Sequence, residues 1–384
     1  MQLEWLVFPG WTCLAASVAG LLYLIISAFA VRILLAQPRL SGVATPITIL
    51  KPLRGADAQL YENLRSFCLQ EYAQFQIVFG VADADDPAAS VVRRLIADFP
   101  ALDLALVAGG AARAPNRKVA NLMNMLSAAR HRQLVISDSD MRVMPDYLAT
   151  IAPLLAASDA GLVTCLYRGV PAGTDFWSRM ACLHINHGFF PEAAVGELVH
   201  AGDGAFGATL ALSRTNLDAI GGLAAIADRL ADDHALGAAV RRLGRPVTLA
   251  PVIVDNVVFE PSLGALFNHE LRWARTVRMV APAGYAGSVI THPVALAVLA
   301  VLFHPTAWSF YGLIAAFLAR IGTVWLNDRA LRLDRTPVYL VPLRDGLSFA
   351  VFVASFFAQS VAWRDRRYRI AKGGRLTLDG DSSV

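Results

Sequence analysis

Lysine and cysteine are both scarce in this chain of 384 residues. Only three lysines are present, Lys51, Lys118 and Lys372, so arginine carries most of the positive charge. The four cysteines form no Cys-x-x-Cys pair and show no zinc spacing, which argues against a cysteine-based metal site. This usage fits a reducing compartment, in which the cysteines serve as small apolar packing residues.

Charge is also sparse, because charged residues make up 17% of the chain and hydrophobic residues 56%. Between Trp11 and Ala36 only Arg32 is charged, and this stretch exceeds the roughly 20 apolar residues that span a bilayer. No small-residue cleavage site follows it, which indicates a retained anchor rather than a signal peptide. Two further apolar zones cover Val289–Trp325, interrupted at His304 and Pro305, and Gly346–Trp363.

The part between these zones is mixed polar and apolar and carries most of the carboxylates. We therefore predict three parts: an N-terminal transmembrane anchor over residues 1–40, a middle domain with interfacial helices over 41–285, and a C-terminal membrane region with a basic tail over 286–384. No internal repeat or low-complexity linker is visible.

Basic residues flank the apolar zones. Those after the first zone place the middle domain in the cytoplasm by the positive-inside tendency. The basic clusters on either side of the third zone both favour the cytoplasmic side, which they cannot share if the second zone is a two-span hairpin and the third crosses fully. The span count stays open, with a re-entrant or interfacial segment as the alternative.

Because these charges sit where anionic lipid lies, we expect a bilayer and no nucleic acid as partner. The clusters are Arg32, Arg39, Lys51 and Arg54; Arg329, Arg332, Arg335 and Arg344; and Arg364, Arg366, Arg367, Arg369, Lys372 and Arg375.

Short β-branched runs alternate with helical stretches in the middle domain. This alternation predicts an α/β fold with a parallel sheet that helices cover on both faces. The expected strands are 47–50, 75–81, 102–107, 133–137 and 161–167, and the expected helices are 57–69, 87–99, 116–130 and 145–157.

Two aspartates one residue apart, Asp138 and Asp140, follow the predicted strand Gln133–Ser137. A strand that delivers them to its carboxyl edge places two hard oxygen ligands where open α/β sheets bind ligands. Such ligands suit Mg²⁺ or Mn²⁺ carrying a diphosphate. An Asp-x-Asp pair is also common by chance and then decorates a turn.

Further aspartates fall at strand ends and helix starts. Asp83 ends the strand 75–81 and is the better functional candidate, whereas Asp86, before Pro87, is expected to cap a helix. Asp232 and Asp233 open another predicted helix, where one can cap and the other can act as a general base.

Two amphipathic stretches, Phe176–Phe190 and Phe267–Val280, interleave aromatics with arginines, as helices on a membrane surface do. Core helices can have the same composition. His184 and His187 are three residues apart and are candidate metal ligands, but no cysteine or carboxylate set completes a zinc site, which favours a lipid interface.

In order, the segments ILKPLRG, GVADADDPA, NRKVANLMN, SDSDMRV, FGATLALSR, IGGL, ADDHAL and HELRW resemble the GT-A glycosyltransferases of the ceramide glucosyltransferase type. Within that group the resemblance is strongest to the bacterial hopanoid-associated branch. It extends from about Pro46 to about Pro282 and implies a Rossmann-like GT-A domain. One position departs from the family pattern, because His269 stands three residues before Arg272, where Gln or Arg is usual.

The resemblance implies a role for each motif residue. Asp138 and Asp140 hold Mg²⁺ or Mn²⁺ on the diphosphate of a UDP-sugar, and Asp233 takes the proton from the acceptor hydroxyl. The remaining roles are these: Asp83 binds the uridine or ribose, Arg272 clamps the leaving diphosphate, Trp273 stacks on sugar or lipid, and His187 touches donor or acceptor. Lys118 approaches the phosphates, or else it lies on a solvated helix face.

These roles imply an inverting, metal-dependent transfer of a sugar to a membrane lipid at the bacterial inner membrane, with the catalytic domain in the cytoplasm. The family suggests N-acetylglucosamine and a bacteriohopanetetrol-type hopanoid, with glucose and ceramide as the alternative pair. A phosphatase of the haloacid dehalogenase type would need Thr or Val where Arg142 stands. A processive polysaccharide synthase would have more spans, and a non-catalytic membrane-anchored binding module would tolerate loss of Asp233.

Overall fold

A computed structural model describes residues 4–40, 42, 44–57, 59–157, 159–199, 204–357, 360–363, 366–371 and 375–378. The chain forms two compact units. The helical unit comprises Met1–Ala36, Thr174–Val199 and Glu260–Arg367, and the sheet unit comprises Gln37–Gly173, His200–Phe259 and Tyr368–Val384. The three-part division expected from the sequence stays a prediction.

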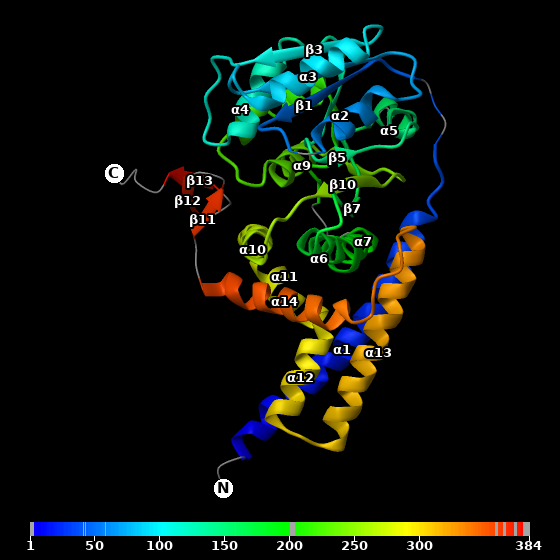
Figure 1. Cartoon of the computed structure of the whole chain (residues 1–384), viewed down its shortest axis with the longest axis vertical. Coiled ribbons are helices and arrows are strands. Elements are labelled where there is room, and N and C mark those ends of the chain that lie inside the picture. Colours follow the sequence, from blue (N-terminus) through cyan, green and yellow to red (C-terminus); the bar gives the residue numbers. More distant parts are fainter. Residues whose placement is uncertain are drawn as a thin grey trace. The chain divides into compact units, whose positions relative to one another are not determined.

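A seven-stranded sheet organises the sheet unit, in the strand order β3-β2-β1-β4-β8-β6-β9, and Figure 1 labels β1 and β3 of this sheet. Strands β3, β2, β1 and β4 are parallel to their neighbours, as the alternating sequence pattern predicts. The strands are β1 (Ile47–Leu53), β2 (Phe75–Val81), β3 (Asp103–Ala108), β4 (Gln133–Ile136), β6 (Leu162–Thr164), β8 (Leu210–Ser213) and β9 (Val247–Leu249).

The expectation of a wholly parallel sheet is wrong at β8, which runs antiparallel to both β4 and β6. The cause is local. The backbone N–H of Asp138 donates to the carbonyl of Gly207 at 3.3 Å, so the chain enters β8 beside the point where β4 ends. From there β8 can pair with β4 only by running back along it.

The single strand predicted over 161–167 is in fact two short strands in different sheets. β6 belongs to the large sheet, and β7 (Tyr167–Pro171) pairs with β10 (Val254–Val258) in a three-stranded sheet completed by β5 (Met141–Arg142). The apolar run shows no break because the connecting residues Cys165 and Leu166 are themselves buried.

Helices cover both faces of the large sheet, which confirms the two-sided arrangement. Alternation along β1 sends Ile47 and Ile49 into one core and Leu50 into the other. The first core is closed by α2 (Leu60–Cys68), α3 (Pro87–Asp98) and α5 (Tyr147–Ala156), and the second by α4 (Arg117–Met125), α8 (Arg214–Ala219), the 3₁₀ turn η2 (Leu223–Ile226) and α9 (Asp232–Arg242).

The helical unit contains the apolar zones. Among the described residues, three helices are long and apolar enough to cross a membrane, namely Leu6–Leu35, Ala307–Ala330 and Leu340–Phe357, and a fourth span results if the bent pair Pro282–Thr291 and Pro293–Phe303 (71°) is counted as one. The elements are α1 (Glu4–Leu35), α6 (Phe176–His184), the π-helical turn η1 (Ile185–Phe189), α7 (Phe190–Leu198), α10 (Leu263–Val280), α11 (Pro282–Gly287), η3 (Ser288–Thr291), α12 (Pro293–Phe303), α13 (Ala307–Ala330), α14 (Leu340–Ala354) and η4 (Ser355–Phe357).

The sequence break at His304 and Pro305 does divide two helices, since α12 ends at Phe303 and α13 starts at Ala307 with Thr306 as its cap. The third zone is displaced from its predicted bounds. Its helix begins at Leu340, before the predicted Gly346, because Arg344 and Asp345 are buried in ion pairs and so fit within an apolar helix. Beyond η4, β11 (Ser360–Trp363), β12 (Arg366–Ala371) and β13 (Arg375–Leu378) form a small sheet.

Candidate active site

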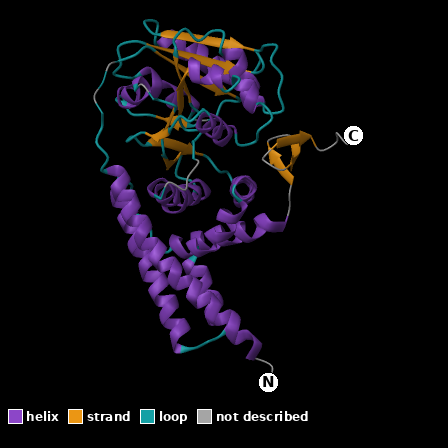
Figure 2. Cartoon of the chain, turned by 180° about the vertical axis from the view of Figure 1, so that it is seen from behind, coloured by secondary structure: helices purple, strands orange, loops and turns teal. Residues whose placement is uncertain are grey.

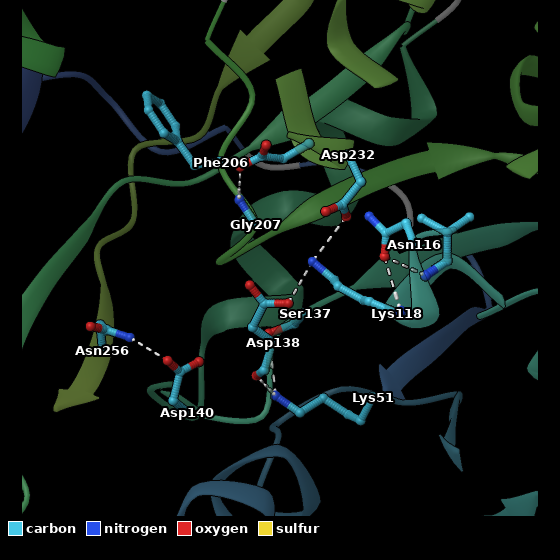
Figure 3. Close-up of polar contacts among 12 residues, drawn as sticks. Lys51, Asn116, Lys118, Ser137, Asp138, Asp140, Phe206, Gly207, Asp232 and Asn256 are labelled. Atoms are coloured by element: carbon cyan, nitrogen blue, oxygen red, sulfur yellow. Dashed lines mark hydrogen bonds and ion pairs between the residues drawn. The ribbon is translucent and has the colours of Figure 1, made fainter. Parts of the chain in front are cut away.

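The end of β4 brings the Asp-x-Asp pair into a dense polar cluster (Figure 3). Two contacts fix the backbone of Asp138: its N–H donates to Gly207, and its carbonyl accepts a hydrogen bond of 2.5 Å from Lys51 Nζ. The side chain of Asp138 is 34% exposed. Asp138 is therefore held rigidly while its charged group stays open to a ligand.

Asp140 is the more enclosed of the pair. Its Oδ2 accepts a hydrogen bond of 2.9 Å from Asn256 Nδ2, whereas its Oδ1 is buried and has no hydrogen-bond partner among the described residues. Burial and the neighbouring Asp138 raise the pKa of Asp140 above its ordinary range. A buried carboxylate oxygen without a partner is costly unless a cation or donor meets it, so the pair fits a divalent cation.

No group of three or more His, Cys, Asp or Glu side chains is arranged to hold a metal ion in the part of the chain that the structure describes. Two carboxylates alone are what Mg²⁺-type sites use when substrate phosphates and water complete the coordination. The donor set thus suits an ion that arrives with a diphosphate rather than a closed structural site.

Lys118 joins this pair to the start of α9. Its Nζ lies 2.7 Å from Asp138 Oδ1 and 3.0 Å from Asp232 Oδ2. Burial disfavours the ammonium, but the two carboxylates outweigh that effect and raise the pKa of Lys118. The alternative of a solvated helix face is wrong for this residue.

Asn116 explains how Lys118 is placed. As the N-cap of α4 it accepts hydrogen bonds from the N–H groups of Lys118 and Val119, and its Nδ2 donates to the carbonyl of Arg229 at 2.8 Å. The Asn in the NRK segment therefore fixes the start of α4, which aims the lysine at the carboxylates.

Neither Asp232 nor Asp233 caps α9, because Ala231 occupies that position without a side-chain cap. Asp232 pairs with Lys118, while Asp233 Oδ2 accepts from the N–H of Gly207 at 3.1 Å. Burial, followed by the charge of Asp232, raises the pKa of Asp233 to about 6. A carboxylate whose pKa is raised in this way suits the role of a general base near neutral pH.

Gly207 lies between the carboxylates of Asp138 and Asp233. A Cβ at this position would lie 2.7 Å from Asp138 Oδ2 and 3.6 Å from Asp233 Oδ2. The absence of a side chain here lets both carboxylates approach the same point. The FGATL segment thus supplies the gap in which the two groups face each other.

Lys51 and Tyr167 are site residues that sequence reasoning missed in this role. Lys51 is fully buried, lies 3.3 Å from Ser137 Oγ and sits over the ring of Phe67 at 3.8 Å. Burial lowers its pKa to about 7. The signal was available, since a lysine in a buried strand of a lysine-poor chain needs a partner.

Tyr167 starts β7 and faces the acidic cluster. Burial, then the charges of Asp233, Asp140 and Asp138, raise the pKa of Tyr167 far above its ordinary value. Its phenol therefore stays neutral and lies within electrostatic reach of all three carboxylates. No local sequence signal marks it, because β7 was not expected as a separate strand.

Asp83 and Asp86 occupy the turn after β2. Asp86 caps α3 by accepting from the N–H of Ala88, which confirms its expected role. Asp83 is exposed, and its Oδ1 accepts from the N–H of Asp85 at 3.1 Å. The structure leaves its carboxylate accessible to a ligand.

The Arg-Trp motif lies on α10 in the helical unit. Arg272 and Trp273 are both half-buried, and the ring of Trp273 meets the ring of His269 edge to face at 4.4 Å. His269 Nδ1 lies 2.5 Å from Oε1 of the buried Glu260. The unusual His269 is thus anchored by a carboxylate and packs against the motif tryptophan.

His187 lies in the π-helical turn η1 and is buried. Its Nε2 lies 3.1 Å from Asp328 Oδ1 and 3.2 Å from Thr336 Oγ1, and its Nδ1 has no hydrogen-bond partner among the described residues. Burial lowers the pKa of His187. The ring therefore ties η1 to the end of α13.

The mixed sheet, with acidic residues at the carboxyl end of β4 and at the start of α9, is of the GT-A type, as the solved structures with the same fold indicate. Comparison with known proteins agrees: the chain belongs to Glycosyl transferase family 21, whose model matches residues 12–376. It is therefore a glycosyltransferase.

The chain is 24% identical over 370 residues to ceramide glucosyltransferase 1 of Caenorhabditis elegans, which covers 90% of this chain and 75% of that protein. It is 23% identical to ceramide glucosyltransferase 3 of the same organism, covering 86% and 74%. Among solved structures, the mannosyltransferase PcManGT of Pyrobaculum calidifontis in complex with GDP-Man and Mn²⁺ matches with a TM-score of 0.55 and 19% identity, covering 91% of this chain and 99% of that one. The similarity to the mannosyltransferase structure shows that this chain has the same fold.

Proposed function

We propose that the protein is an inverting, metal-dependent glycosyltransferase that moves a sugar from a UDP-sugar to the hydroxyl of a membrane lipid. The observation that carries the proposal is the convergence of Asp138 and Asp233 on Gly207, with Lys118 paired to Asp138. Under this proposal, the carboxylate that would hold the metal lies next to the carboxylate that would act as general base.

Asp138 and Asp140 would hold Mg²⁺ or Mn²⁺, which supplies positive charge to the departing diphosphate. Lys118, already paired with Asp138, adds a second cation where the phosphates would lie. Asp83 is the proposed contact to the uridine or ribose. The PcManGT complex with GDP-Man and Mn²⁺ is consistent with a metal-bound sugar nucleotide on this fold.

Asp233 would remove the proton of the acceptor hydroxyl. As that oxygen bonds to the anomeric carbon, the bond from this carbon to UDP breaks, the proton passes to Asp233 and UDP leaves as an anion. Attack from the opposite face inverts the configuration in one displacement. Arg272 is proposed to clamp the leaving diphosphate, and Trp273 to stack on sugar or lipid.

His187 is proposed to touch donor or acceptor, as the family resemblance implies. The three candidate spans support a membrane-embedded enzyme with a lipid acceptor. We place it in a bacterial inner membrane with the catalytic domain in the cytoplasm, on the strength of the basic residues that follow α1.

For the substrates we propose N-acetylglucosamine from UDP-N-acetylglucosamine and a bacteriohopanetetrol-type hopanoid. This assignment rests on the resemblance of the chain's motifs to the hopanoid-associated branch. The competing pair, UDP-glucose and ceramide, is favoured by the two ceramide glucosyltransferases that match most of the chain.

Purified full-length protein supplied with each UDP-sugar and each lipid, with and without EDTA, tests the proposal by mass spectrometry of the lipid products. We expect one glycolipid, lost in EDTA and lost in Asp233→Asn, while Asp218→Asn on the exposed face of α8 serves as the matched control. Product that persists in Asp233→Asn, or no glycolipid from any pair, contradicts the proposal. A product from ceramide alone would reject only the hopanoid assignment.

A further inference from the structure

In helix α14 the charged residues are buried and the apolar residues are exposed. This is the reverse of a helix on the surface of a soluble protein. Arg344 and Asp345 are buried, 2% and 9% exposed, on the side that faces the protein. The outward side is apolar at helical spacing. Its exposed residues are Pro342, Leu343, Gly346, Ala350 and Val353, and the exposed Phe356 and Phe357 follow in η4.

The buried charges of α14 reach two different helices of the same unit. Arg344 makes two hydrogen bonds, of 2.8 and 2.7 Å, to the carboxylate of Glu270 on α10. Asp345 accepts three, of 2.9 to 3.0 Å, from the guanidinium of Arg320 on α13. Paired and multiply hydrogen-bonded, these charges can stay out of water.

Both ends of α14 contact the same helix, α10. Arg344 near its start pairs with Glu270, and Phe356 just past its end lies 5.5 Å from the guanidinium of Arg278. Glu270 and Arg278 are eight residues apart, a rise of only about 12 Å. The two ends of α14 therefore lie near one short stretch of α10.

Helix α10 itself is not among the candidate spans, and it carries His269, Glu270, Arg272, Arg275 and Arg278. Such a helix belongs at the membrane surface. If the helix from Leu340 to Phe357 crossed the bilayer, the two contacting residues Arg344 and Phe356, twelve residues apart, would differ in depth by about 18 Å along the membrane normal. One end would then have to leave α10, which the two contacts exclude.

The ribbon views agree with this geometry. In Figure 1, α14 crosses the bundle of α1, α12 and α13 at a steep angle instead of running along it. Figure 2 shows the same crossing from behind. The spans of the bundle and α14 thus have different directions within one unit.

We propose that α14 is not a transmembrane span but an interfacial helix, which lies on the bilayer with its apolar side in the acyl chains. Its two ends are then on the same side of the membrane as α10. The basic cluster at residues 329–335 and the basic tail after residue 363 share that side, which removes the conflict in the charge pattern. The inference depends on neither the donor nor the acceptor.

The arrangement also bears on the Arg-Trp motif. Arg344 forms an ion pair with Glu270, which lies two residues before Arg272 in the sequence. Helix α14 therefore anchors the part of α10 that carries the motif. A lipid hydroxyl at the interface would meet this motif at the depth that α14 sets.

Depth measurement on full-length protein in liposomes tests the proposal. Single cysteines at Leu343, Ala350 and Phe357, all exposed, would carry nitroxide labels in a Cys13→Ser background, and the other native cysteines are buried. Oxygen and nickel-chelate accessibility should report the same depth at the three sites. A spanning helix would instead place Ala350 about 10 Å deeper than its neighbours seven residues away, and that result would overturn the proposal.

Tyr311 and Leu318 on α13 are the matched control, because both are 63% exposed and are also seven residues apart. Their depths should differ by about 10 Å, since α13 crosses the membrane. An independent check labels Arg335→Cys, Ser383→Cys and Arg94→Cys with a membrane-impermeant maleimide in right-side-out and inverted vesicles. All three should react from one side, and reaction of residue 383 from the side opposite to residue 335 would refute the assignment.

Discussion

The ammonium of Lys118 bridges Asp138 Oδ1, at 2.7 Å, and Asp232 Oδ2, at 3.0 Å. One cation thereby connects the end of β4 to the first turn of α9. The proposed metal pair and the proposed base belong to segments almost 100 residues apart, and this contact is what makes them one site.

Lys118→Gln should cost about 100-fold in kcat/KM, because it removes a fixed positive charge from a water-poor site where diphosphate charge develops. Arg117→Gln, one residue earlier and exposed, is the control and should be nearly silent. Steady-state kinetics at saturating lipid would measure both. Equal losses in the two variants would show that the charge of α4 as a whole, not Lys118, is responsible.

Asp140→Asn should abolish metal-dependent donor binding, because it removes the buried oxygen that has no protein partner among the described residues. Titration of Mn²⁺ with UDP, followed by calorimetry, would show the loss, with wild-type folding checked by circular dichroism. Asp218→Asn provides the comparison for a surface carboxylate. Unchanged Mn²⁺-dependent UDP binding would remove Asp140 from the metal site.

Activity should fall on the acid side of about pH 6. Burial and Asp232 raise the pKa of Asp233 to about 6, and a base must be deprotonated to accept a proton. The value of kcat/KM is therefore expected to be level above that pH and to drop about tenfold for each pH unit below it.

Asp232→Asn tests the cause. Removing the neighbouring negative charge leaves burial as the main effect, so the acid limb should move to lower pH by less than the full shift. A pH profile with Asp159→Asn as control would measure it. If the acid limb of the pH profile shifts to higher pH, or does not shift, Asp233 is not the titrating base.

Gly207→Ala should lower kcat by roughly 10- to 100-fold while the protein stays folded. The new methyl group would lie 2.7 Å from Asp138 Oδ2 and so displace a carboxylate, and misplacing a reacting group by about 1 Å is enough for such a loss. Gly287→Ala is the control, since a Cβ there meets no atom within 4 Å. Full activity in Gly207→Ala would mean that the two carboxylates need not converge there.

Arg344→Gln should destabilise the helical unit by about 3–5 kcal/mol, because it leaves Glu270 buried and unpaired. The double variant Arg344→Leu with Glu270→Leu should recover most of this loss, since no buried charge is then left alone. Thermal unfolding in detergent would compare them with Arg94→Gln, whose pair with Asp98 is exposed and contributes little. A double variant no more stable than Arg344→Gln would contradict this account.

Much of the sheet unit was predictable because its signals are local. The strands over 75–81 and 133–137, the helix starting at Pro87 and the Asp86 cap all follow from composition and from neighbours within a few residues. The break at His304 and Pro305 divided α12 from α13 for the same reason. Proline and capping chemistry act on the chain next to them.

The direction of β8, the split of β6 from β7 and the partners of Lys51 were not predictable in this way. Each depends on a hydrogen bond or ion pair between residues far apart in the sequence, such as Lys51 with Asp138. A buried lysine is a local oddity, but which carbonyl it meets is decided by strand order.

By itself the sequence determined that this chain has segments apolar enough to span a membrane, an α/β domain and aspartates at the strand ends that suit a metal and a base, because hydropathy, periodicity and side-chain chemistry are properties of short segments. Only the tertiary structure decided that Lys118 joins Asp138 to Asp232, that the surroundings of Asp233 raise its pKa to about 6, and that both ends of α14 contact α10. Those outcomes are set by burial and by the distances between segments remote in the chain, and such distances exist only once the chain has folded.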